Sequence, residues 1–238
     1  MTPPAYFHLA DAGSQQLLGS SAKDAPYHVE SRFCFHDGTH LHNRRTTDLA
    51  LEVKHNKRDE LIISSWTGER VVHRSLTGEF ESRGFTGYRL RPATVRFRDG
   101  YLSDEYSELI VTGWAGIARP ESGIELREDC PGCPLKRYTS LQDAEQLIDW
   151  SQWTGEDFFI VWPLPLYTLV TNRVADALKS LKVKSYRLSS LRMLEQRFIP
   201  ASLLPSHGGF TVGALSDFMP DDIAIKYGKP AGLEWADA

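Results

Sequence analysis

The apolar and polar positions of this chain follow the spacing of β-strands more often than that of helices. In the N-terminal half, apolar runs rich in β-favouring residues predict strands at 49–53, 60–66 and 109–114. Glycine recurs between these runs, as turns between strands require. Residues 115–123 contain glycine and proline and predict a loop that leads to another short apolar segment at 124–126.

The second half of the chain contains the clearest strand pattern. Residues 157–162, with the sequence DFFIVW, form an almost continuous apolar run that Pro163 and Pro165 end. Further strands are predicted at 167–170, 186–188 and 191–193. From Ser206 onward glycine and proline become frequent, which favours an irregular C-terminal tail.

Helical periodicity is limited to two places. Thr171 suits the N-cap of a helix that runs to about Leu181, because Val174, Leu178 and Leu181 then share one face. Residues 143–150 predict a shorter helix. Strands and helices do not alternate as a doubly wound parallel sheet requires. The pattern therefore predicts an α+β fold of mostly antiparallel strands with few helices.

The length of the chain bounds its organisation. Its 238 residues suffice for one large domain or two small ones. No stretch has the composition of a linker. We expect a single globular chain over 1–238, with two lobes joined near residues 130–133: a β-rich lobe at 1–125 and an α+β lobe at 135–238.

Composition and charge exclude several classes of function. The net charge of −4, with acidic and basic residues interleaved, gives no basic surface for nucleic acid or for an anionic membrane. No apolar run has the length of a membrane span, and residues 1–8 lack the pattern of a signal peptide. The three cysteines, an odd number, argue against a disulfide framework. We therefore expect a cytoplasmic protein.

The most distinctive chemistry of the sequence lies at Cys130-Pro-Gly-Cys133, the CPGC turn. Two thiolates at this spacing bind one tetrahedral metal ion from the same side. The chain holds one further cysteine, Cys34, and His36 lies two residues after it. Three thiolates and one imidazole are a recognised structural zinc set. The predicted metal ligands are Cys34, His36, Cys130 and Cys133, and the cofactor expected there is a structural zinc ion.

Two other interpretations of these residues stay open. The CPGC turn can hold two ordinary thiols; redox use is disfavoured because Pro134 and a β-favouring segment follow in place of a helix. His36, His40 and His42 lie among Asp, Gly, Thr and Asn, which is typical of a solvated polar loop. These three histidines are also the residues from which a catalytic metal site would be built.

Aromatic residues are concentrated between 150 and 167. We expect Phe159 and Trp162 in the core, since each ring buries a large apolar area. Trp153 and Tyr167 suit either the core or a binding pocket. The sequence contains no nucleophile elbow, no phosphate-binding glycine loop and no metalloprotease motif, so it identifies no catalytic residues.

A wider pattern resembles a known family. Residues 108–116, 120–123 and the CPGC turn are followed by Leu147-Ile-Asp, by Asp157-Phe-Phe, by Trp162-Pro-Leu-Pro and by Val170-Thr-x-Arg-Val-Ala. Over about 105–200 this resembles the double-CxxCG motif proteins, which are similar to immunity proteins of contact-dependent bacterial toxin systems. Here Pro134 stands where that motif has glycine, and the first motif is reduced to Cys34. The metal-binding role implied by the family transfers only to Cys130 and Cys133.

The resemblance implies a function that the residues themselves do not identify. We expect a non-catalytic immunity protein that binds a cognate protein toxin and covers its active surface. The acidic net charge suits a basic toxin such as a nuclease. The alternative is a metal-dependent enzyme that uses His36, His40 and His42. The sequence leaves the toxin, the binding surface and the oligomeric state open.

Overall fold

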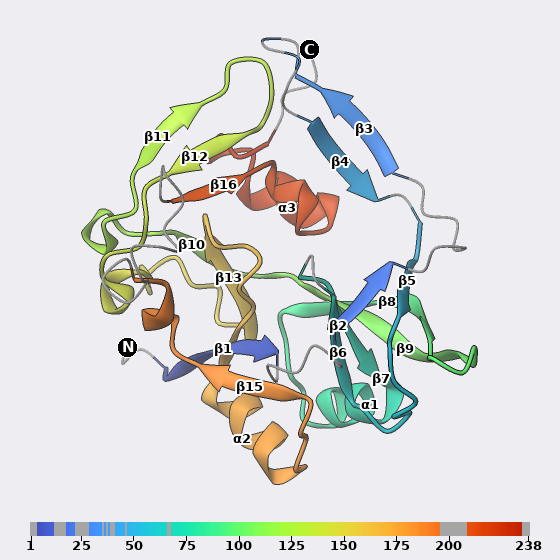
Figure 1. Cartoon of the computed structure of the whole chain (residues 1–238). Coiled ribbons are helices and arrows are strands. Elements are labelled where there is room, and N and C mark those ends of the chain that lie inside the picture. Colours follow the sequence, from blue (N-terminus) through green and yellow to red (C-terminus); the bar gives the residue numbers. More distant parts are fainter. Residues whose placement is uncertain are drawn as a thin grey trace.

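The computed structural model describes residues 4–11, 18–21, 29–34, 36, 38, 41–45, 47–65, 68–195 and 209–234 (Figure 1). Strands dominate this part of the chain, and most neighbouring strands are antiparallel. It contains a closed six-stranded barrel, a five-stranded sheet, a three-stranded sheet and a two-stranded hairpin, together with three α-helices. The α+β prediction is therefore confirmed.

The barrel has the strand order β2-β5-β8-β9-β7-β6. Its strands are β2 (Leu18–Ser21), β5 (Leu49–Glu52), β6 (Ile62–Ser65), β7 (Arg70–His73), β8 (Tyr88–Arg96) and β9 (Leu102–Val111). Alternate side chains point inward, as the two-residue period of a strand requires. The resulting interior contains Leu49, Leu51, Val53, Ile63, Val71, Ala93, Val95, Phe97 and Tyr106. The strands predicted at 49–53 and 60–66 are β5 and β6.

Helix α1 (Arg74–Ser82) packs against β7 and β9 on the outside of the barrel. Its buried residues include Leu76 and Phe80. The N-cap is His73, whose ring accepts a hydrogen bond from the backbone N–H of Ser75. The sequence contains no clear start signal for this helix, because histidine is not among the usual capping residues.

The five-stranded sheet has the order β10-β13-β14-β1-β15. Its strands are β1 (Tyr6–Asp11), β10 (Gly113–Ile117), β13 (Phe158–Trp162), β14 (Leu169–Thr171) and β15 (Tyr186–Ser189). All five residues of β13 are buried, which explains the continuous apolar run in the sequence. Phe159 and Trp162 are fully buried, as predicted. Strand β1 comes from the N-terminal part of the chain and lies between β14 and β15, so this sheet combines residues 6–11 with strands from residues 113–189.

Helix α2 (Asn172–Ser180) packs against β14 and β1. Its N-cap position is Thr171 and its C-cap is Leu181, so the predicted helix is confirmed at both ends. The Thr171 hydroxyl does not cap the helix. It donates instead to a carboxylate oxygen of Asp157, at 2.8 Å. The N-cap prediction was therefore right in position and wrong in the partner of the side chain.

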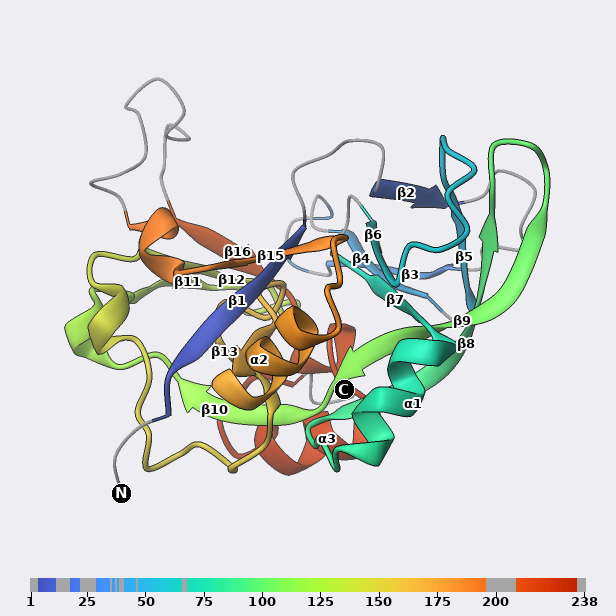
Figure 2. The same ribbon diagram turned by 90° about the horizontal axis from the view of Figure 1, so that it is seen from below.

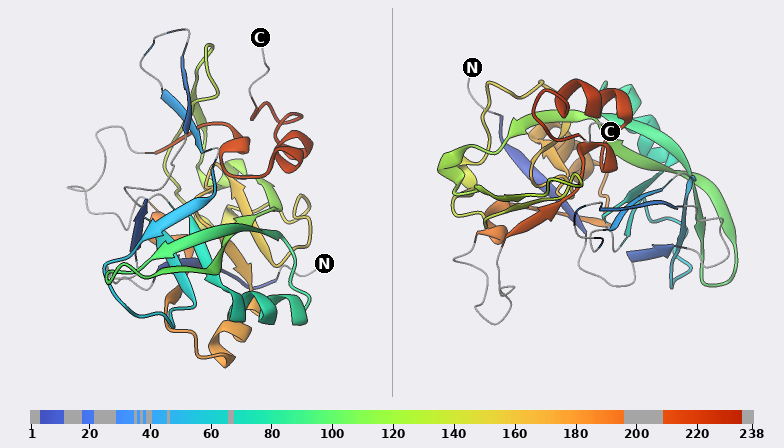
Figure 3. Two further views of the ribbon diagram at one scale, coloured as in Figure 1. Left: turned by 90° about the vertical axis from the view of Figure 1, so that its right-hand side faces the viewer. Right: turned by 90° about the horizontal axis from the view of Figure 1, so that it is seen from above.

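The remaining strands form two small sheets. The three-stranded sheet contains β11 (Leu126–Asp129), β12 (Lys136–Tyr138) and β16 (Phe210–Val212), and the hairpin contains β3 (Val29–Phe33) and β4 (Leu41–Arg45). Within the described residues, the hairpin pairs with none of the other sheets. Helix α3 (Asp221–Tyr227) lies beside the ribbon of β9 and β10 in Figure 3. The Tyr227 ring of α3 stacks on the Trp114 ring of β10, with 5.8 Å between the ring centroids.

Four sequence predictions were wrong. The predicted helix at 143–150 is only a 3₁₀ turn at Ala144–Gln146, with Asp143 as its N-cap, where the side chain accepts from the Glu145 N–H. The predicted strand at 191–193 is the 3₁₀ helix Leu191–Leu194, which Ser190 caps in the same way. The predicted loop at 115–123 contains the end of β10 and the 3₁₀ helix Pro120–Ser122. The predicted irregular tail contains β16, a 3₁₀ helix at Leu215–Asp217 and α3.

The strand predicted at 109–114 is divided between two sheets. Strand β9 ends at Val111 in the barrel, and β10 begins at Gly113 in the five-stranded sheet. Between them the backbone N–H groups of Thr112 and Gly113 both donate to the carbonyl oxygen of Gly87, at 2.8 and 3.2 Å. Figure 2 shows β9 and β10 as one long ribbon that crosses the molecule. The division is a change of hydrogen-bonding partner, which the apolar pattern does not record.

The barrel and the five-stranded sheet meet where Gly87 contacts the start of β13. Gly87 has a φ of +85°, and a Cβ atom at this position would overlap the carbonyl oxygen of Phe158. The neighbouring backbone N–H of Phe158 donates to the carbonyl of Thr86 at 3.0 Å. Only glycine combines this backbone conformation with so close an approach.

We predict that Gly87→Ala destabilises the protein by more than about 3 kcal/mol, because the new methyl group meets backbone that cannot move aside. Gly84→Ala is the matched control, since Gly84 also has a positive φ but a Cβ atom added to it would meet nothing within 4 Å. We expect the control to cost about 1 kcal/mol. Urea unfolding followed by tryptophan fluorescence measures both; equal losses would show that steric overlap is not the cause.

The carboxylate of Asp157 reinforces the same junction. This side chain is 3% exposed and accepts hydrogen bonds from the Thr86 N–H at 3.3 Å, the Thr171 hydroxyl at 2.8 Å and Arg173 at 2.8 Å. All three partners are donors. Asp157 thus joins the segment before β8 to the end of β14 and the first turn of α2.

Asp157→Asn should destabilise the protein by about 3 kcal/mol, because the amide NH₂ would face a donor and Arg173 would lose its counter-ion. The control is Asp176→Asn, which removes the same charge from an exposed pair with Lys179 and should change stability by less than about 0.5 kcal/mol. The measurement is again urea unfolding. A loss below about 1 kcal/mol for Asp157→Asn would contradict the role of this network.

Candidate metal centre

The CPGC turn joins strands β11 and β12. Its ends are held by the backbone N–H of Cys130, which donates to the Leu135 carbonyl at 3.1 Å, and by an ion pair between Lys136 and Asp129 at 2.5 Å. These contacts between β11 and β12 therefore hold both ends of the CPGC turn in place. Cys130 is buried and Cys133 is half-buried.

Cys34 lies directly after β3, on the segment that Figure 1 shows pointing towards this turn. Its sulfur lies 3.5 Å from that of Cys130, and the sulfurs of Cys34, Cys130 and Cys133 all lie within 4.8 Å of one another. Cys34 is 3% exposed. Cys34, which is far from the CPGC turn in sequence, and the two cysteines of the turn are thus close enough to bind one metal ion.

The spacing of the sulfurs fits zinc. Zinc binds thiolates at about 2.3 Å, so two sulfurs on one tetrahedral ion lie about 3.8 Å apart. The separation of 3.5 Å between the sulfurs of Cys34 and Cys130 is close to that value, and no pair in the cluster is more than 4.8 Å apart. The backbone N–H of His36 donates to the Cys34 sulfur at 3.4 Å, which favours the thiolate form that a metal needs. Three sulfurs suit zinc better than magnesium or calcium, which prefer oxygen ligands.

The thiols need a cation to become thiolates together. Burial, and then the hydrogen bonds to Cys130 and Cys34, raise the pKa of Cys133 to about 12, against a partial lowering by the Leu135 backbone. A bound Zn²⁺ reverses this balance, because its charge stabilises each thiolate directly. The cluster would therefore release protons when it takes up metal.

Gly132 allows the two segments to approach closely. A Cβ atom at this position would lie 2.6 Å from the Cβ of His36 and 3.2 Å from the Cys34 sulfur. Any other residue would therefore push the segment of Cys34 away from the turn. The glycine in the middle of the CPGC turn has a steric reason that the motif alone did not reveal.

The structure brings together three of the four predicted ligands. The His36 side chain is exposed, and its ring nitrogens do not belong to the group of ligand atoms within 4.8 Å of one another. Its assignment as the fourth ligand stays a prediction. His40 and the side chain of His42 lie outside the described residues, so the predicted histidine site is not placed. In the described part of the chain, Cys34, Cys130 and Cys133 form the one group of three or more residues able to hold a metal ion.

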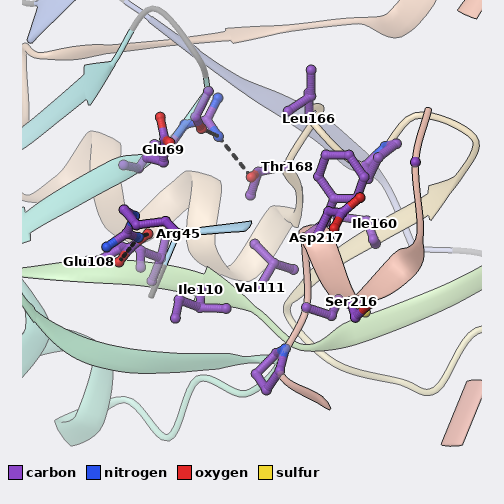
Figure 4. A pocket seen from close by; sticks show the side chains of 18 of the residues that line it. Arg45, Glu69, Glu108, Ile110, Val111, Ile160, Leu166, Thr168, Ser216 and Asp217 are labelled. Carbon is purple, nitrogen blue, oxygen red and sulfur yellow. Dashed lines mark hydrogen bonds and ion pairs between the residues drawn. The ribbon is translucent and has the colours of Figure 1, made fainter. Parts of the chain in front are cut away.

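A cavity of about 750 Å³ borders the metal centre, and sequence reasoning missed it. Cys133, Pro134 and Leu135 form part of its wall. Figure 4 shows Arg45 and Glu108 in contact on one side and Asp217 with Ile160 on the other. No sequence signal marks this cavity, because its residues come from segments far apart in the chain and carry no shared motif.

A second constellation outside the metal centre consists of Ser75, His73 and Glu105. The His73 ring contacts the Ser75 hydroxyl at 2.8 Å through Nδ1 and Glu105 at 3.3 Å through Nε2. The same Nδ1 accepts from the Ser75 backbone N–H at 3.3 Å, and Arg74 binds Glu105 at 2.5 Å. These contacts cap the N-terminus of α1, and this structural role is sufficient to explain why Ser75, His73 and Glu105 lie together.

Comparisons with known proteins identify no relative: no protein-family model matches the chain, and neither does any curated protein. Membrane insertion through a helix also finds no support in the described residues, where every helix is too short or too polar to cross a bilayer. The chemistry of the site therefore rests on its own geometry.

We predict that the protein purified without chelator contains about one zinc ion per chain, and that Cys34→Ser, Cys130→Ser and Cys133→Ser each reduce this content to background. Elemental analysis by mass spectrometry measures the zinc. Replacement with Co²⁺ should produce a strong thiolate-to-metal absorption band. If the protein folds but contains no zinc even after incubation with excess zinc, the predicted site is wrong.

The fourth ligand can be tested separately. If His36 is the ligand, His36→Ala should weaken zinc binding and change the cobalt spectrum, whereas His73→Ala, which alters a histidine outside the cluster, should do neither. An unchanged spectrum in His36→Ala would assign the fourth position to another group.

Proposed function

We propose that this chain is a cytoplasmic, non-catalytic immunity protein that binds a cognate protein toxin and covers its active surface. The observation that carries the proposal is the gathering of Cys34, Cys130 and Cys133 into one cluster. This is the donor set of a structural metal site, and it contains Cys130 and Cys133, the two residues to which the resemblance to double-CxxCG proteins assigns a metal-binding role.

The position of the cluster supports a structural role. It joins the segment after β3 to the turn between β11 and β12, two parts of the chain that share no sheet. A metal held there would stabilise the protein by the free energy of its binding to the folded state. A rigid surface suits a protein whose function is to cover a partner, because less conformational freedom is lost on binding.

Charge supports a basic partner. The net charge of −4 would attract a basic toxin such as a nuclease and raise the rate of association. This contribution acts over a distance and is screened by salt. It gives speed and selectivity of encounter, while affinity depends on the contact surface itself.

The alternative is a metal-dependent enzyme. The observation that favours it is the half-buried Cys133, which belongs both to the metal cluster and to the wall of the cavity. A metal at this position would border a space large enough for a substrate. In this alternative a metal position open to the cavity, in place of a fourth protein ligand, would serve catalysis.

The toxin encoded next to the gene provides the test. We expect the purified protein to form a one-to-one complex with it, to abolish its activity only when equimolar, and to protect a sensitive host in co-expression. Raised salt should slow association without abolishing the complex. An enzyme would act at far below equimolar amounts.

Two results would overturn the proposal. One is the absence of both a complex and protection when the two proteins are present together. The other is neutralisation at substoichiometric amounts that chelation abolishes while the fold is retained, which would favour the enzyme. Cys130→Ser, assayed at a temperature where it stays folded, separates these cases, because occlusion should survive loss of the metal better than catalysis.

A further inference from the structure

The cavity lies over one open end of the barrel. Strands β8 and β9 continue past the barrel interior, so that Arg91 and Glu108 face each other across the ribbon just beyond Ala93 and Tyr106. Residues of β13, of the CPGC hairpin and of the segment around Phe218 close the other sides. Its volume of about 750 Å³ falls within the range of about 300–1,000 Å³ that small-molecule sites occupy.

One carboxylate at the floor of the cavity binds two guanidinium groups. Arg45 donates from Nη2 to both oxygens of Glu108, at 2.5 and 2.6 Å. Arg91 donates to Oε2 from Nε at 3.0 Å and from Nη2 at 2.8 Å. The side chains of Arg45 and Glu108 are 10% and 6% exposed, so this pair is largely removed from water, whereas the side chain of Arg91 is 39% exposed.

The cluster has an excess of positive charge. Two arginines share the single carboxylate of Glu108, and Arg45 makes its remaining contact with the neutral carbonyl of Thr47 at 2.6 Å. Within the described residues, Nη1 of Arg91 makes no hydrogen bond; the Arg91 side chain is 39% exposed and lines the cavity. An anion in the cavity can therefore pair with the accessible guanidinium of Arg91 through a charge-assisted hydrogen bond without displacing Glu108.

A further arginine of the lining is Arg70, which is 7% exposed and donates to the Thr168 hydroxyl at 2.9 Å. The lining contains four arginines and three acidic residues, and its Arg89 is paired with Asp222 just outside the lining at 2.6 Å. The positive excess of the cavity is therefore local to the cluster of Arg45, Glu108 and Arg91.

Opposite the arginines the wall is apolar. Val111, Ile160, Leu166, Phe218 and Met219 line the cavity there. Figure 4 shows Val111 between the Arg45–Glu108 pair and the segment of Ser216 and Asp217, with Ile160 beside Asp217. A site of this kind recognises a molecule with an apolar body and one charged group, because the few polar contacts fix its orientation.

We propose that this cavity binds an organic anion, with Arg91 and Arg45 holding a carboxylate or phosphate group and the apolar wall holding the body of the molecule. The planar guanidinium matches both anionic groups through paired hydrogen bonds. Glu108 positions the two arginines before the ligand arrives. The inference is independent of the proposed immunity function and of zinc.

The competing explanation is that the three residues only attach β4 to the barrel. Both explanations predict that the cluster stabilises the fold, so stability cannot separate them. Binding of matched charged and neutral probes can, because a purely structural cluster has no reason to distinguish them.

The experiment measures binding of 2-naphthoate, 1-naphthyl phosphate and neutral 2-naphthamide to the whole protein by calorimetry. We expect one site, at least about tenfold tighter binding of one of the anions than of the amide, and an affinity for that anion that falls as sodium chloride is raised. The comparison of the two anions shows which group the site prefers.

Arg91→Gln should weaken binding of the anion about tenfold or more and leave binding of the amide unchanged, while Arg91→Lys should retain part of the preference. Arg127→Gln, on the exposed strand β11 outside the cavity lining, is the control of equal charge change and should bind all probes as the original does.

Three results would overturn the proposal: equal affinities of the unaltered protein for anions and amide, no binding of any probe, or an anion preference that survives Arg91→Gln. If Arg91→Gln does not fold, the salt dependence and the anion preference of the unaltered protein still decide the matter.

Discussion

The fold depends on one close contact, where the backbone at Gly87 meets the first residue of β13. There the chain leaves the barrel and enters the five-stranded sheet, with backbone hydrogen bonds linking Thr86 to Phe158 and Gly87 to the start of β10. Asp157 adds three hydrogen bonds at the same place. No Cβ atom fits between Gly87 and the Phe158 carbonyl, so backbone meets backbone where the barrel joins the five-stranded sheet. This contact fixes the distance between the barrel and the sheet at the junction.

The hairpin of β3 and β4 is attached by polar contacts at both of its ends. Cys34, after β3, meets Cys130 and Cys133, and Arg45, at the end of β4, binds Glu108 in the barrel. In the part of the chain that the structure describes, the hairpin pairs with no other sheet, and these two contacts link it to the rest of the molecule. Because Cys133 and Arg45 both line the cavity, the cysteine cluster and the cavity are neighbouring parts of one arrangement.

Electrostatics differ between the two sites. The cysteine cluster gathers groups that become negative on deprotonation and thus favours a cation. The Arg45–Glu108–Arg91 cluster has more positive than negative charge and favours an anion. In both sites the protein side chains do not balance the charge by themselves: the thiolates would need a cation, and the two arginines share one carboxylate. Burial of Cys34, Cys130, Arg45 and Glu108 raises the free-energy cost of an unbalanced charge. The acidic net charge of the chain reveals neither site.

The sequence by itself determined the elements whose pattern is local: β13, in which every residue is apolar, helix α2 with its two ends, and the small set of residues able to bind metal. Only the tertiary structure decided that residues 109–114 divide between two sheets, that Cys34 reaches the CPGC turn, and that Glu108 holds two arginines. The physical reason is that periodicity reports which face of a segment is buried, whereas the identity of its neighbour depends on long-range backbone pairing and close approach.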